Sequence, residues 1–173
     1  MLIPEAEVRS RVEALARQIS EDYAAVDELL LVGVLKGAFI FLADLSRCLT
    51  IPRSIDFIAV SSYAHSSRTS GAVRLVMDLR TPIEGRHVLV VEDILETGYT
   101  LEYLVDVLAA RKPASLKTCV LVRKQRRQKV QATVDYLGFE IPDVWVVGYG
   151  LDYAERNRTL PYIGVIEPDD RSA

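Results

Sequence analysis

Three acidic side chains stand close together in residues 88–101, directly after an apolar run. Glu92 and Asp93 follow four Val and Leu residues, and Glu96 comes three positions later. Carboxylates at the end of a strand can hold sugar hydroxyls or a divalent cation, and a third can act as a base. Adjacent acids can also be ordinary surface charge. Here they interrupt a buried element, which favours a functional role.

A short turn with two hydroxyls and a glycine follows Glu96, made of Thr97, Gly98, Tyr99 and Thr100. Glycine permits a positive φ and close approach of a ligand, and the N–H groups at the start of a coming helix favour a phosphate. A plain helix N-cap would use similar residues. The acids just before the turn favour a ligand-binding turn over a plain helix N-cap. The sequence lacks the G-x-x-x-x-G-K-[ST] pattern of Walker-type loops.

The elements that position these residues follow from hydrophobic periodicity. The spacing of apolar residues predicts helices over residues 5–24 and 38–45 and a third marked by Leu101 and Leu108. Apolar runs predict strands at 29–35, 55–60, 73–77, 88–91, 118–122 and 144–147, with residues 139–142 as a connection. Alternating strands and helices indicate an α/β fold with a largely parallel sheet, whose ligands lie beyond the carboxyl ends of strands.

Bulk composition excludes several classes. The 173 residues predict one domain, and a net charge of −3 argues against a surface that coats nucleic acid, although a local basic patch stays possible. The N-terminus lacks the pattern of a signal peptide, and no apolar run approaches the roughly 20 residues that span a bilayer. Cys48 and Cys119 have apolar neighbours, so buried reduced thiols are favoured over a disulfide. We expect a cytoplasmic protein without membrane or nucleic-acid partners.

Residues 88–101 resemble the 5-phosphoribosyl 1-diphosphate-binding motif of the type I phosphoribosyltransferases, and the Glu-Asp pair is similar to that of the hypoxanthine-guanine branch. Leu35-Lys36-Gly37 resembles the diphosphate loop of that family. Residues 61–71 resemble its flexible catalytic loop, and residues 138–143 and 146–153 resemble its purine-site signature. The resemblance covers nearly the whole chain in the family's order.

The resemblance implies a type I phosphoribosyltransferase fold over residues 1–173, Rossmann-like, with a small hood from the two chain ends. It implies purine salvage: Mg²⁺-dependent, reversible transfer of 5-phosphoribosyl from 5-phosphoribosyl 1-diphosphate to hypoxanthine, guanine or both. The products are IMP or GMP and diphosphate. By resemblance we also expect a homodimer or homotetramer.

The resemblance assigns the sugar, phosphate and metal roles residue by residue. Ribose contacts, direct or through Mg²⁺, fall to Glu92 and Asp93, with Asp152 as an acid of a second metal site. The 5′-phosphate falls to Thr97, Gly98, Thr100 and the amide of Tyr99, and Glu96 is also assigned to the residues that bind ribose and 5′-phosphate. Diphosphate falls to Lys36, Gly37 and Arg158, in a loop where the family has a cis peptide bond. The flexible lid falls to Ser62 and Tyr63; a hairpin without that role is the alternative. Without the resemblance, Arg158 would be taken as a surface arginine.

The base half of the site is assigned in the same way. Lys124 matches the donor to the purine 6-oxo group, although the rest of the basic run 123–129 is typical of a solvated turn. Trp145 matches an aromatic residue that stacks on the purine, with a core tryptophan as the alternative. Val146 matches a position that reads the base through its backbone, and Asp152 is assigned to the purine-binding residues as well as to the metal site.

Glu96 departs from the family pattern, which usually has aspartate there. The family residue accepts or donates the proton at purine N7. Glutamate carries the same chemistry on an arm one methylene longer, so we expect Glu96 to be the proton acceptor.

Two other functions share this fold. One is an RNA-binding regulator like the pyrimidine-operon attenuation proteins, whose motif is usually Asp-Asp and which lack the Gly-Tyr-Gly-Leu-Asp-Tyr segment at 148–153. The other is a phosphoribosyltransferase for xanthine or a pyrimidine. Lys124 and Trp145 favour a 6-oxopurine without choosing among hypoxanthine, guanine and xanthine.

Overall fold

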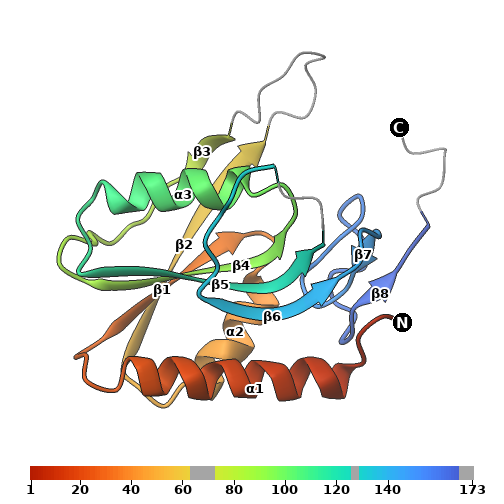
Figure 1. Cartoon of the computed structure of the whole chain (residues 1–173), viewed down its shortest axis with the longest axis horizontal. Helices are drawn as coiled ribbons and strands as arrows, with labels where there is room; N and C mark the ends of the chain where they lie inside the picture. The colour runs from red at the N-terminus through yellow and green to blue at the C-terminus, as the bar shows by residue number, and fades with distance from the viewer. Residues whose placement is uncertain (63–72, 126–128, 168–173) are drawn as a thin grey trace.

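A twisted six-stranded sheet with helices on both faces forms the body of the protein (Figure 1). The computed structural model describes residues 1–62, 73–125 and 129–167. In chain order the elements are α1 (Glu5–Asp22), β1 (Leu29–Leu35), α2 (Phe39–Cys48), β2 (Arg53–Ser62), β3 (Val73–Met77), β4 (His87–Leu95), α3 (Tyr99–Ala109), β5 (Ser115–Lys124), β6 (Tyr136–Ile141), β7 (Val146–Val147) and β8 (Gly164–Val165). The predicted α/β class is confirmed.

The strand order β3-β2-β1-β4-β5-β6 reverses direction at β1. All neighbouring strands are parallel apart from β3, which runs antiparallel to β2 at one edge. Chain connections leave β1 toward β2 on one side and return to β4 on the other. In such a sheet, the loops after the two strands at the reversal diverge and leave a crevice for ligands. The loops after β1 and β4 contain two of the segments predicted to bind ligand.

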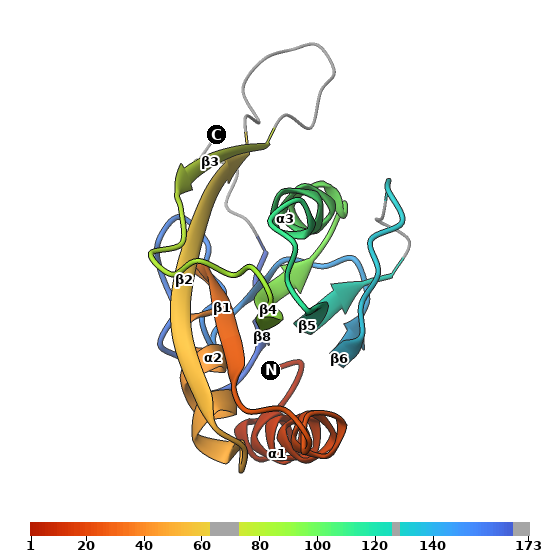
Figure 2. The ribbon, with the colours of Figure 1, turned by 90° about the vertical axis from the view of Figure 1, so that its left-hand side faces the viewer.

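Two apolar cores follow from the alternation of side chains along the strands. Leu29 and Leu31 of β1 face a core shared with α1 and α2. Leu30 and Val32 face the opposite core, which contains the buried side of α3. Figure 2 shows α3 on one face of the sheet and α1 and α2 on the other. Because both faces are covered, the central strands are apolar throughout rather than alternating.

Strand β4 is longer than its apolar run suggested. The prediction that the strand ends at Val91 is wrong, because β4 continues to Leu95. Glu92 pairs with Val120 and Ile94 with Val122 on β5. The ladder is made by backbone groups, so a charged side chain does not end it. Glu92 therefore lies within the sheet and is only 5% exposed.

Two predictions near the C-terminus are also wrong. Residues 139–141, predicted as a connection, belong to the parallel edge strand β6. A Cβ atom on Gly138 would lie 2.2 Å from the Leu121 carbonyl oxygen, so this glycine permits close approach of β5. Of the predicted core strand 144–147, only Val146 and Val147 form a strand, β7. The backbone of β7 pairs with β8 in a separate antiparallel sheet and not with the six-stranded sheet.

The two ends of the described chain lie side by side (Figure 1). The N–H of Ile3 donates to the carbonyl oxygen of Ile163, and the reverse bond is also present, both at 3.0 Å. This pairing places the first residues beside β7 and β8. The assignment of these segments as a hood stays a prediction.

The two cysteines differ in environment. Both are free thiols, as expected, and Cys119 is buried in β5. The expectation that Cys48 is buried is wrong: it is exposed at the end of α2, off the buried stripe of Phe41, Leu42 and Leu45. Within the described ranges, no helix is long and apolar enough to cross a membrane.

Candidate active site

The loop after β1 lies against the acidic end of β4. A Cβ atom on Gly37 would lie 1.7 Å from Oδ2 of Asp93, so the carboxylate touches the glycine backbone and leaves no room for a side chain. The Leu35–Lys36 peptide bond is cis, as the resemblance implies. Nζ of Lys36 donates to Oε2 of Glu155 at 3.0 Å, and both side chains are about two-thirds exposed. The lysine is therefore held at the surface by an ion pair.

The two acids Glu92 and Asp93 are buried, and the pKa values of both are raised. Burial and the neighbouring Asp93 carboxylate raise the pKa of Glu92 to about 8. Burial raises the pKa of Asp93 to about 6, although the backbone N–H groups of Asp93 and Ile94 and the charge of Arg158 act to lower it. Oε2 of Glu92 is buried and has no hydrogen-bond partner among the described residues. Perturbed carboxylates of this kind are typical of a ligand site.

The turn after β4 opens into the first turn of α3. Gly98 has a φ of 91° and stands at the N-cap, and a Cβ atom there would lie 2.7 Å from the Val130 carbonyl oxygen. The N–H groups of Lys129 and Val130 donate to the carbonyl oxygen of Thr97 at 2.9 and 3.2 Å. In the described part of the chain, no side chain caps α3. The helix start therefore keeps N–H groups that an anion can accept from.

Lys124 forms the centre of a second group of residues. It ends β5, and its side chain is 1% exposed. Nζ lies 2.5 Å from Oε1 of Glu96, 3.8 Å from Oδ1 of Asp143 and 5.4 Å from the centroid of the Trp145 ring. Trp145 is 48% exposed, so it is not a core residue. A buried ammonium group beside an accessible aromatic face suits a flat ligand that carries a hydrogen-bond acceptor.

Arg158 is not the solvated surface arginine that its sequence context allowed. Its side chain is 17% exposed, and Nη1 lies 2.9 Å from both Oδ1 of Asp152 and the carbonyl oxygen of Gly150. Its Nε is buried and has no hydrogen-bond partner within the described ranges. Oδ2 of Asp152 accepts the N–H of Glu155 at 2.7 Å. An arginine and an acid are thus held together near Asp93, whose pKa both affect.

The predicted residues form two contact groups, one that extends from Lys36 to Arg158 and one around Lys124. Strand β4 connects the two groups. Val146 is buried in β7, and its backbone role stays a prediction. Ser62 ends β2, whereas Tyr63 lies outside the described residues, so the lid stays a prediction.

Several site residues escaped the sequence analysis. Glu155 contacts Lys36 and Arg158, yet an exposed glutamate gives no signal in the sequence. Tyr153 packs edge-on against Trp145, with ring centroids 5.8 Å apart. Asp143 approaches Lys124. Tyr153 and Asp143 lie in segments already matched to the purine-site signature, which could have indicated them.

The donor set fits Mg²⁺ held partly by substrate. Among residues 1–62, 73–125 and 129–167, no three His, Cys, Asp or Glu side chains form a complete metal cage. Mg²⁺ is usually bound by one or two carboxylates together with water and substrate phosphates. Glu92, which has an oxygen without a partner among the described residues, and Asp93, whose pKa is raised, are two carboxylates that could take this role. The metal role of Glu92, Asp93 and Asp152 stays a prediction.

Comparison with known proteins gives a consistent family. A model of the phosphoribosyl transferase domain matches residues 5–154. The hypoxanthine-guanine phosphoribosyltransferase of Dictyostelium discoideum is 46% identical over 98% of this chain and 96% of its own length. The hypoxanthine phosphoribosyltransferase of Haemophilus influenzae is 47% identical over 96% of this chain and 94% of its own length.

A solved structure agrees with the sequence comparisons. The crystal structure of a hypoxanthine-guanine phosphoribosyltransferase from Bacillus anthracis superposes with a TM-score of 0.91 at 44% identity, over 96% of this chain and 98% of that one. Fold and length therefore agree. The chain belongs to the family of the hypoxanthine-guanine phosphoribosyltransferases, a group of pentosyltransferase enzymes.

Proposed function

We propose that the enzyme transfers 5-phosphoribosyl from 5-phosphoribosyl 1-diphosphate to hypoxanthine, guanine or both, and releases IMP or GMP and diphosphate. The observation that carries this proposal is the buried Lys124 ammonium, 2.5 Å from Glu96 and beside the exposed Trp145 ring. A donor at this place suits the 6-oxo group of a purine. A 6-amino group would present N–H to N–H, and a site built around one donor rejects such an analogue strongly.

The sugar-phosphate half consists of the acid pair and the turn after it. Glu92 and Asp93 hold the ribose hydroxyls, and residues 97–100 hold the 5′-phosphate at the open start of α3. Lys36, Gly37 and Arg158 receive the diphosphate. Two of these carry positive charge, which stabilises the leaving group as its negative charge grows.

Bond changes follow from this placement. A purine ring nitrogen attacks C1′ of the ribose while the C1′–O bond breaks and its electron pair leaves with the diphosphate. The Glu96 carboxylate accepts the proton from purine N7, and Lys124 holds the 6-oxo group so that the nitrogen faces C1′. Trp145 stacks on the purine ring, and the backbone at Val146 reads its edge. When bound, Mg²⁺ neutralises diphosphate charge, and Glu92, Asp93 and Asp152 are the residues that would hold it.

Steady-state kcat/KM values for hypoxanthine, guanine, xanthine and adenine, with 5-phosphoribosyl 1-diphosphate and Mg²⁺, test the proposal. We expect adenine to be poorer than the best 6-oxopurine by at least about 100-fold. Comparable values for adenine would contradict the role of Lys124. Absence of any nucleotide product, together with RNA binding that weakens steeply with salt, would favour the regulator instead.

Two further properties belong to the proposal. A cytoplasmic location is supported by the two free thiols, which are typical of a reducing compartment. A homodimer or homotetramer is supported by large apolar side chains on α2, β2 and β3 that are 40–59% exposed, namely Phe39, Ile55, Val76 and Met77. Sedimentation velocity would measure this assembly directly.

A further inference from the structure

The turn of residues 148–150 lies directly on the loop proposed to bind diphosphate. A Cβ atom on Gly150 would lie 1.9 Å from the Gly37 carbonyl oxygen, so the two backbones touch. Gly150 also exchanges backbone and side-chain bonds with Arg158: its N–H donates to the Arg158 carbonyl oxygen, and its own carbonyl oxygen accepts from Nη1, both at 2.9 Å. Any shift of this turn therefore moves both Gly37 and Arg158.

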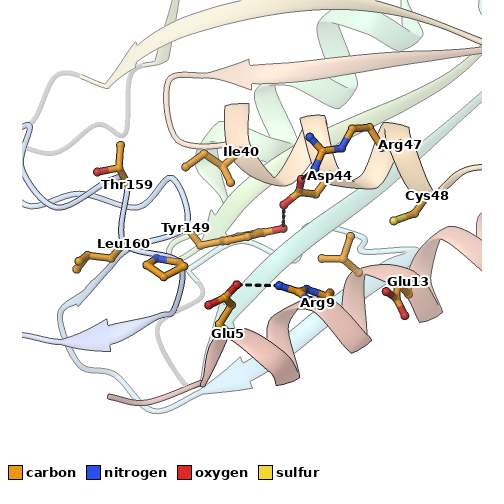
Figure 3. Close-up of a pocket in the computed structure, with 12 residues that line it drawn as sticks. Glu5, Arg9, Glu13, Ile40, Asp44, Arg47, Cys48, Tyr149, Thr159 and Leu160 are labelled. Atoms are coloured by element: carbon orange, nitrogen blue, oxygen red, sulfur yellow. Dashed lines mark hydrogen bonds and ion pairs between the residues drawn. The ribbon is translucent and has the colours of Figure 1, made fainter.

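Tyr149 occupies the middle of this turn, where its φ is 52°. A side chain in the left-handed region costs about 1 kcal/mol, and both neighbours are glycines with positive φ. The Tyr149 side chain is 7% exposed, and its hydroxyl donates to Oδ2 of Asp44 at 2.6 Å (Figure 3). Burial, followed by the hydrogen bond to Asp44, raises the pKa of Tyr149, so the hydroxyl keeps its proton.

Asp44 belongs to the helix that starts at the diphosphate loop. Helix α2 begins at Phe39, whose N–H donates to the Lys36 carbonyl oxygen of the loop at 3.3 Å. The N–H of Ala38, just before the helix, donates to the carbonyl oxygen of Val34 in β1, also at 3.3 Å. Oδ1 of Asp44 pairs with Arg47 at 3.0 Å, which fixes the carboxylate. The diphosphate loop is thus bounded by α2 on one side and by the 148–150 turn on the other.

The hydrogen bond from Tyr149 to Asp44 joins the 148–150 turn to α2, although the two residues are 105 positions apart in the sequence. It crosses the wall of a hollow of about 480 Å³ between α1, α2 and residues 159–161 (Figure 3). This hollow is lined by none of the residues predicted from the sequence to bind substrate. Tyr149 therefore faces a hollow that is separate from the predicted substrate-binding residues.

We propose that Tyr149 is a positioning residue: its hydroxyl, held by Asp44, fixes the 148–150 turn relative to α2. The bond keeps Lys36, Gly37 and Arg158 in the mutual arrangement that receives diphosphate. This inference rests on the proposed function, because it assigns an effect on one substrate of that reaction. The purine half, with Lys124 and Trp145, lies outside the bounded loop.

Kinetics of Tyr149→Phe test the inference, since the variant keeps the ring and removes only the hydroxyl. We expect KM for 5-phosphoribosyl 1-diphosphate, and for diphosphate in the reverse direction, to rise about tenfold, as for loss of one charge-assisted hydrogen bond. KM for hypoxanthine should stay within about twofold. Equal changes in both KM values, or no change in either, would overturn the inference.

Tyr136→Phe is the matched control. Tyr136 is also buried and donates to a helical carboxylate, Oδ2 of Asp22 at 2.5 Å, at the opposite end of the sheet. It should lower the melting temperature to a similar extent and leave both KM values unchanged. An equal rise in KM for 5-phosphoribosyl 1-diphosphate in this control would mean that general destabilisation explains the effect.

Asp44 gives a second route if Tyr149→Phe does not fold. Asp44→Asn keeps an acceptor oxygen and should retain most of the affinity for 5-phosphoribosyl 1-diphosphate that Asp44→Ala loses. Equal KM values in these two variants would count against the inference. An inactive wild-type enzyme would contradict the proposed function itself, whereas an active wild type with an unchanged Tyr149→Phe variant contradicts only the positioning role.

Discussion

The carboxylates Asp22 and Glu92, at opposite ends of the sheet, differ in whether they have partners. At the amino end, Tyr136 donates to Asp22, and Nζ of Lys117 lies 3.1 Å from the Tyr136 hydroxyl and 3.4 Å from Oδ2 of Asp22. The same ammonium group lies over the rings of Tyr23 and Tyr136, 5.4 and 5.2 Å from their centroids. The hydrogen bond from Tyr136 lowers the pKa of Asp22. Each charge here has a partner.

At the carboxyl end, the pKa values shift the other way. Burial raises that of Glu92 to about 8, and one of its oxygens has no partner among the described residues. Such an arrangement costs stability in the free protein and provides binding energy when a ligand arrives. The contrast teaches that paired charges stabilise the amino end, whereas the carboxyl end has the unpartnered buried carboxylate that is typical of a ligand site.

The largest effect should come from Glu96→Gln, which removes the proposed proton acceptor and preserves shape. We expect kcat to fall by at least about 100-fold, as for loss of a general base. Steady-state kinetics with a saturating purine measure it. Glu5→Gln serves as control, because Glu5 pairs with Arg9 on the exposed surface of α1. Near-normal turnover of Glu96→Gln would rule out this residue as the base.

Two glycines give the next comparison. Gly150→Ala would place a methyl group 1.9 Å from the Gly37 carbonyl oxygen, whereas a Cβ atom on Gly85 meets nothing within 4 Å. Both have positive φ, so both pay the left-handed penalty of about 1 kcal/mol. We expect the free energy of unfolding of Gly150→Ala to be lower than that of Gly85→Ala by a further 1 to 3 kcal/mol, roughly the cost of a forced overlap. Urea unfolding measures the difference; equal losses would contradict the close contact.

Glu92→Gln should stabilise the ligand-free protein at high pH. Between about pH 4.5 and 8, the unfolded chain has lost the Glu92 proton while the folded chain keeps it, so the free energy of unfolding falls as pH rises. We expect the variant to be more stable by roughly 4 kcal/mol at pH 8 and equal to wild type near pH 4. Parallel curves of unfolding free energy against pH would refute the shifted pKa.

The smallest effect belongs to the amino end. Asp22→Asn should cost at most about 1 kcal/mol near pH 7, because the ion pair with Lys117 is partly exposed. The pKa of Asp22 is lowered on folding, so its contribution is present above the unfolded pKa and disappears as the pH falls through the folded one. Both KM values and kcat should match wild type. Altered kinetics would mean that the two ends are coupled.

Local patterns predicted the parts that depend on local physics. The bounds of β1 and β3 were predicted from their apolar runs, and the parallel arrangement brings Gly37 and Asp93 to one edge of the sheet. The extension of β4 through Glu92 was missed because ladder bonds ignore side-chain charge. Strand β6 was missed because Gly138 and Glu140 interrupt its apolar residues, so residues 136–141 contain no continuous apolar run.

Contacts between distant residues left no trace in the sequence. Tyr149 and Asp44 are 105 positions apart, and neither type nor spacing links them. Glu155 resembles any exposed glutamate until the fold places Lys36 and Arg158 beside it. The base half was indicated only by resemblance, because a single buried lysine such as Lys124 has no periodic signature.

The chain has a single tryptophan, and its position gives the enzyme an optical probe of its own. The Trp145 ring is 48% exposed, lies 5.4 Å from the Lys124 ammonium and meets the edge of Tyr153. All indole emission therefore originates at one point, where water is in contact with the ring before a ligand covers it. The colour and intensity of that emission report on this surface alone, without any attached dye.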